Sequence, residues 1–81
     1  MITINDVCNL AVYGGKYRQI YLVCNKYSTA ISFGVRDVGR LNPDILDFPV
    51  NGIRPSNLGI DDILEVIVSD KHFEIIDRIR N

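Results

Sequence analysis

The sequence of 81 residues contains no tryptophan, a single histidine and only two cysteines. Two cysteines are too few for the disulfide framework of a small secreted domain, and Cys8 and Cys24 lack the paired spacing of a zinc site. Each stands among apolar residues, where a cysteine behaves as a small hydrophobic side chain. We therefore expect two buried, reduced thiols, and we predict no metal site and no cofactor.

Long apolar runs are also missing. No run approaches the ~20 residues that cross a bilayer, and Met1 to Asp6 lack the basic and apolar regions of a signal peptide. We therefore expect a cytoplasmic protein with no membrane partner. The apolar fraction of 47% and the charged fraction of 23% are typical of a globular chain. The length favours one domain, residues 1–81, whose small core leaves homo-oligomerisation open.

Groups that carry catalysis are scarce as well. His72 stands on an apolar stripe, which indicates a structural residue rather than a general base. The acidic run at 61–65 lacks the spacing of a calcium loop. The run Gly14-Gly15-Lys16 lacks the Ser or Thr that follows lysine in a phosphate loop, and a helix rather than a strand precedes it. We predict no catalytic residue and no enzymatic activity.

The first segment has the features of a helix. Thr3 and Asp6 stand at the two positions of a capping box, and Gly14-Gly15 provides a stop. The residues expected on its buried face are spaced at i, i+3, i+4 and i+7: Ile4, Val7, Cys8 and Ala11.

The rest of the chain reads mainly as strands. Residues 18–25 and 29–37 have the composition or alternation of an antiparallel hairpin with a tight connection. Asn42 and Pro43 open a one-turn helix at 43–47. Residues 50–54 resemble an edge strand, and 63–68 a central strand.

The last segment allows a helix or a strand, and we favour a helix. Its apolar stripe at helical spacing consists of His72, Ile75, Ile76 and Ile79. The expected fold is α+β: an N-terminal helix packed on a small, mainly antiparallel sheet of three or four strands, with a one-turn helix at 43–47 and a C-terminal helix.

Charge is distributed unevenly along the chain. Residues 1–40 carry five basic and two acidic residues (5 − 2 = +3), whereas residues 41–81 carry four basic and eight acidic ones (4 − 8 = −4). The hairpin brings one basic and aromatic group to a single end of the sheet: Lys16, Tyr17, Arg18, Arg36 and Arg40. Such a group is suited to an anionic nucleotide or nucleic acid. The alternative is an ordinary solvated surface.

The acidic half provides a competing surface for a protein partner. Its carboxylates would face a basic groove as a mimic of nucleic-acid phosphates. The candidates are Asp44, Asp47, Asp61, Asp62 and Glu65.

The order of the expected elements resembles a group of very small, often phage-borne proteins of Gram-positive bacteria and their phages. The matching stretches are Ile2 to Leu10, Gln19 to Asp37, Pro43 to Val50 and Ile63 to Val68. The resemblance implies a phage accessory protein in the host cytoplasm that inhibits host immunity, in the manner of anti-CRISPR proteins, by stoichiometric binding to a host defence protein. A small oligomer that sequesters a nucleotide or nucleic acid, and a structural or assembly protein without a ligand, are the alternatives.

Overall fold

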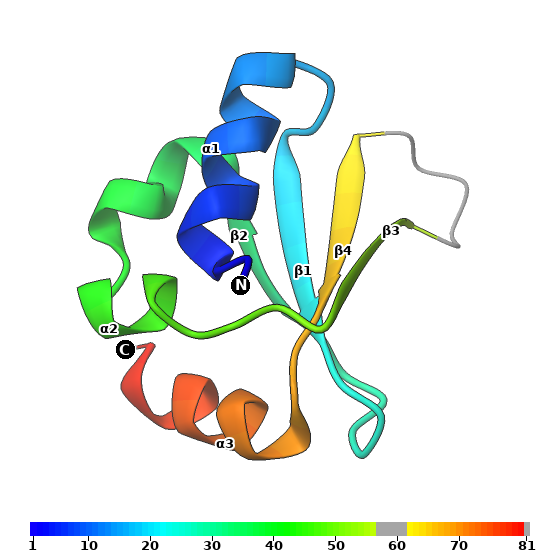
Figure 1. The fold of residues 1–81 in the computed structure, drawn as a ribbon, viewed down its shortest axis with the longest axis vertical. Helices are drawn as coiled ribbons and strands as arrows, with labels where there is room; N and C mark the ends of the chain where they lie inside the picture. The colour runs from blue at the N-terminus through cyan, green and yellow to red at the C-terminus, as the bar shows by residue number, and fades with distance from the viewer. Residues whose placement is uncertain (57–61, 81) are drawn as a thin grey trace.

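The fold comes from a computed structural model, which describes residues 1–56 and 62–80 (Figure 1). Its elements follow in the order α1 (Ile4–Gly14), β1 (Gln19–Val23), β2 (Ile31–Gly34), the 3₁₀ helix η1 (Val35–Arg40), α2 (Pro43–Leu46), β3 (Gly52–Pro55), β4 (Ile63–Ile67) and α3 (Asp70–Ile79). The predicted α+β class is confirmed, and so are the one-turn helix and the C-terminal helix. Among the described residues, no helix has the length and apolar character needed to span a bilayer.

The four strands form one sheet in the order β2-β1-β4-β3. The β1–β2 and β3–β4 pairs are antiparallel, whereas the two central strands, β1 and β4, run parallel. A parallel pair requires a long crossover, here everything from the end of β1 to the start of β4. The edge position of β3 and the central position of β4 are as predicted.

One face of the sheet carries the hydrophobic core. Ile20 and Leu22 pair with Leu64 and Val66, and all four side chains are buried. Helices α1 and α3 complete this core with a second set of buried side chains: Ile4, Val7, Cys8, Ala11, Phe73 and Ile76. Burial of each large aliphatic side chain contributes about 1.5–3 kcal/mol, so this layer holds the fold together.

Helix α1 begins and ends as its sequence predicts. The Thr3 side chain accepts a hydrogen bond from the Asp6 N–H, and the Asp6 carboxylate accepts one from the Thr3 N–H at 2.9 Å. The helix stops at Gly15, whose φ of 67° lies in the left-handed region that glycine adopts without a steric penalty.

Two local predictions need correction. The strand expected at 29–37 is only Ile31–Gly34, because the chain turns at Gly34 into η1 after the Val35 N–H has bonded to the Arg18 carbonyl at 2.9 Å. In α3 the fully buried side chains are Phe73 and Ile76, while His72 is only half-buried at the side of that stripe. Periodicity identified the helix, the buried Ile76 and the adjoining Ile79, but Phe73 rather than His72 completes the buried face.

Candidate functional site

The candidate site lies at the end of the sheet where β1 begins and β2 ends. Two adjoining hollows of about 480 and 340 Å³ share three lining residues, Arg18, Val35 and Arg36. Tyr17 lines the smaller hollow and Asp37 the larger. The structure therefore brings Tyr17, Arg18 and Arg36 together, as the hairpin argument predicted.

Backbone hydrogen bonds hold this arrangement in place. The Arg18 N–H donates to the Asp62 carbonyl at 2.8 Å, which ties the start of β1 to the start of β4. The Arg18 carbonyl accepts from the Val35 N–H, so Arg36 follows directly on the last bond between β1 and β2. Arg36 belongs to η1 and not to a strand, because β2 ends at Gly34. Both arginines thus project from well-anchored backbone.

The guanidinium groups of Arg18 and Arg36 are available to a ligand. Arg18 and Arg36 are exposed, and within residues 1–56 and 62–80 neither takes part in an ion pair. Arg40 differs: its guanidinium lies 3.9 Å from the Asp37 carboxylate, and it lines neither hollow. Counting Lys16, Arg18, Arg36 and Arg40 against Asp37 and Asp62 leaves this end of the molecule with a charge of 4 − 2 = +2.

Lys16 and Tyr17 form the aromatic side of the site. Tyr17 is half-buried and packs against the core, and the Lys16 ammonium lies 5.4 Å from the centre of its ring. A cation at this distance is attracted by the ring. Two main-chain donors at this end are already used, because the Gly15 N–H donates to the Ala11 carbonyl and the Arg18 N–H to the Asp62 carbonyl. The side chains of Lys16, Arg18 and Arg36 provide the positive charge for binding an anion.

The described residues of the alternative acidic surface lie on different parts of the fold. Asp44 and Asp47 lie on or just after α2, to the left of β2 in Figure 1, whereas β4 lies to the right of β1. Glu65 of β4 is only 8% exposed and accepts a 2.9 Å hydrogen bond from Arg54 Nε. Asp62 instead joins the basic end through its carbonyl, and Asp61 lies outside the described residues. The four predicted carboxylates that the structure describes therefore form no common patch.

A second polar cluster, which sequence reasoning missed, ties the β1–β2 connection to α3. Glu74 Oε1 accepts hydrogen bonds from the Tyr27 hydroxyl at 2.6 Å and from Lys26 Nζ at 3.2 Å. The Lys26 N–H donates to Asp70, and the Tyr27 ring stacks on Phe73 with centroids 5.5 Å apart. Lys26 and Tyr27 lie in the β1–β2 connection, at the opposite end of β1 from the basic end. Their partners are too distant in the sequence to be recognised from it.

Hydrogen bonding within this cluster shifts three titrations. The bonds from Tyr27 and Lys26 lower the pKa of Glu74 below its ordinary value. The same carboxylate raises the pKa of Tyr27 and that of Lys26, because it stabilises the protonated form of each. These contacts lie at the surface of the protein and not in its core. We call the contacts of Lys26 and Tyr27 with Glu74 the latch.

The remaining reactive groups have structural surroundings. The His72 ring packs against Phe48 with centroids 4.8 Å apart, and its buried Nδ1 has no hydrogen-bond partner among residues 1–56 and 62–80. Cys8 is buried and Cys24 half-buried, and both are free thiols. In the part of the chain that the structure describes, no three His, Cys, Asp or Glu side chains form a cluster that could hold a metal ion.

No protein-family model, no curated protein and no solved structure matches this chain. The resemblance to small phage proteins therefore stays a prediction.

Proposed function

We propose that this protein is a non-enzymatic binding protein that holds a phosphate-bearing ligand, a nucleotide or a nucleic acid strand, at its basic end. One observation carries the proposal: Arg18 and Arg36 line the same two hollows while neither is neutralised by a carboxylate of a described residue. Guanidinium groups bind phosphate oxygens in a bidentate manner, which gives both affinity and orientation.

The aromatic side of the site supports the same ligand class. Tyr17 lines the hollow next to the two arginines, so a base or sugar beside the bound phosphate would contact its ring. Asp37 lines the larger hollow and pairs with Arg40, so a carboxylate stands on that side of the two arginines. The smaller hollow, which Tyr17 lines, has no carboxylate among the described residues of its lining. The ligand is therefore expected to enter from the Tyr17 side.

Binding of ATP and of a short single-stranded DNA, each measured by calorimetry at low and high salt, tests the proposal. Arg18→Gln and Arg36→Gln should each weaken binding about tenfold, and the affinity for DNA should fall as salt rises. Lys71→Gln is the matched control, since Lys71 is an exposed cation of α3 and changes the net charge equally. Binding of ATP alone would indicate a nucleotide ligand, and binding of DNA alone a nucleic acid.

Absence of salt-sensitive binding to both probes would refute the proposal. Equal losses in Arg18→Gln and Lys71→Gln would also refute it, because they would show a non-specific effect of net charge.

The predicted inhibition of host immunity is a second candidate, and it needs a surface for a protein partner. The groove between the β1–β2 connection and α3 supports it, since this groove has a volume of about 730 Å³ and contains two stacked aromatic rings. Expression of the chain in a bacterium with an active defence system should restore plating of a susceptible phage. An unchanged plating efficiency with several defence systems would contradict it.

A further inference from the structure

The outer edge of β2 has unpaired backbone groups. In an antiparallel pair of strands, hydrogen-bonded and non-hydrogen-bonded residue pairs alternate. Because the Val35 N–H bonds to the Arg18 carbonyl, the next hydrogen-bonded residues of β2 are Phe33 and Ile31, which face β1. The N–H and C=O groups of Ser32 therefore point away from β1. Among the strands that the structure describes, β2 is the last at its side of the sheet, and none pairs with this edge. Such an edge is a template for a further strand.

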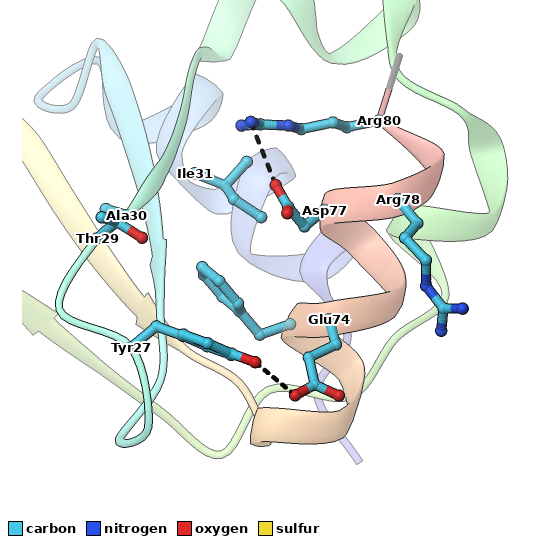
Figure 2. A pocket seen from close by; sticks show the side chains of 9 residues that line it. Tyr27, Thr29, Ala30, Ile31, Glu74, Asp77, Arg78 and Arg80 are labelled. Atoms are coloured by element: carbon cyan, nitrogen blue, oxygen red, sulfur yellow. Dashed lines mark hydrogen bonds and ion pairs between the residues drawn. The ribbon is translucent and has the colours of Figure 1, made fainter.

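A groove runs beside this edge. It consists of two cavities, of about 730 and 210 Å³, which share Ile31 and Arg80. Ser32 lines the smaller cavity together with apolar side chains that include Ile45 and Ile76. The larger one opens between the β1–β2 connection and α3, with the Ile31 side chain directed toward it (Figure 2). An unpaired strand edge thus borders an apolar hollow.

The charges at the larger cavity sum to +1 when Lys26, which pairs with Glu74, is counted with the lining: Lys26, Arg78 and Arg80 against Glu74 and Asp77 (3 − 2). Figure 2 shows Glu74 engaged by Tyr27 and Asp77 by Arg80, the latter pair 3.2 Å apart. The Asp77–Arg80 pair is half-exposed, and exposed pairs of this kind contribute little and exchange readily. Arg78 takes part in no ion pair among the described residues. An incoming carboxylate therefore competes with Asp77 for Arg80, whereas the Arg78 side chain extends away from Ile31 and Tyr27 (Figure 2).

We infer that the groove between β2 and α3 binds an extended segment of a partner protein, which adds to the sheet as a strand beside β2. Main-chain hydrogen bonds to Ser32 would align the segment. Every second side chain of an added strand faces the helix side of the sheet, so an apolar side chain enters the 210 Å³ cavity. An acidic side chain within two or three positions of it pairs with Arg80. This interaction surface is separate from the basic end and independent of the function proposed there.

A second copy of this chain is a poorer occupant. Two β2 strands paired edge to edge would need to supply an apolar side chain to each groove, but Ile31 is 5% exposed and already belongs to its own core.

Selection from a phage-displayed library of random peptides of about nine residues, longer than a typical strand, tests the inference with the full chain as bait. The enriched peptides should share an apolar residue with an acidic residue two or three positions away. One of them is then synthesised, and its affinity is measured by fluorescence anisotropy. Ser32→Pro should weaken binding at least about tenfold, because proline removes the outward N–H without removing a bond to β1. Ser32→Thr keeps the N–H and should bind as the wild type does.

A second pair of variants makes the test independent of the folding of Ser32→Pro. Arg80→Gln should weaken binding of the acidic peptide about tenfold, whereas Asp77→Asn, which removes the competing carboxylate, should strengthen it. Lys71→Gln, which removes an exposed cation of the same helix, should leave peptide binding unchanged. Peptide binding and phosphate binding are measured separately, so failure here and failure at the basic end are distinguishable. Three results would overturn the inference: no enrichment, equal affinity in Arg80→Gln and Asp77→Asn, or a dimer in sedimentation experiments that Ser32→Pro dissociates.

Discussion

Glu74 accepts a 2.6 Å hydrogen bond from the hydroxyl of Tyr27, a residue 47 positions earlier in the chain. The same carboxylate oxygen accepts from Lys26 Nζ, and the Tyr27 ring rests on Phe73 one residue before Glu74. The β1–β2 connection is therefore latched to α3 by charge and by ring stacking together. This latch forms one end of the groove beside β2.

The first prediction concerns the titration of Tyr27. Glu74→Ala removes the acceptor that raises the pKa of Tyr27, so that pKa should fall toward its ordinary value of about 10. NMR of isotope-labelled tyrosine rings, with the signal assigned by Tyr27→Phe, measures it. Asp77→Ala removes a carboxylate of the same helix that does not contact Tyr27 and should leave the titration unchanged. An unchanged Tyr27 titration in Glu74→Ala would show that the latch is open in solution.

The second prediction concerns acid. The folded-state pKa of Glu74 is lowered, so its stabilising contribution is present above the ordinary pKa of about 4.3 and is lost as pH falls through the lower folded value. The wild type should therefore be more stable than Glu74→Gln at neutral pH, and the difference should shrink as pH falls below about 4. Urea unfolding at a series of pH values measures both proteins, and a difference that does not change with pH would contradict the assignment.

The third prediction concerns thiol reactivity. Burial raises the pKa of Cys8 to about 11, so almost no thiolate forms at neutral pH and the side chain is shielded from reagents. In a Cys24→Ser variant, iodoacetamide should not modify the native protein at pH ~8 but should modify it fully in denaturant. Mass spectrometry reads both results. Rapid native modification would mean that α1 opens from the core.

The fourth prediction compares two neighbouring glycines at the end of α1. Gly15 has a φ of 67°, so Gly15→Ala should destabilise the fold by about 1–2 kcal/mol. Gly14 is the last helical residue, and a Cβ there would meet nothing within 4 Å. Gly14→Ala should therefore stabilise the fold by up to about 1 kcal/mol. Thermal unfolding of both variants measures the difference, and equal effects would contradict the left-handed turn at Gly15.

Features that depend on neighbours in the chain were accessible from the sequence. Thr3, Asp6 and Gly15 specify the two ends of α1 through contacts within a turn, and Asn42 caps α2 in the same way. The strand positions followed from side-chain alternation and apolar composition. The grouping of Tyr17, Arg18 and Arg36 was also predictable, since a hairpin returns the chain to its starting point.

Features that join distant segments were accessible only from the folded chain. The parallel pairing of β1 with β4 and the bonds of Tyr27 and Lys26 to Glu74 have no local signal, because each depends on how the crossover closes. The turn at Gly34 has the same origin, since the last bond of β2 goes to Arg18 and the chain then enters η1. The scattering of the acidic residues and the groove beside β2 follow from these long-range pairings. Local hydrogen bonds and side-chain periodicity thus specified the individual helices and strands. Packing of the sheet against α3 decided which surfaces face a ligand.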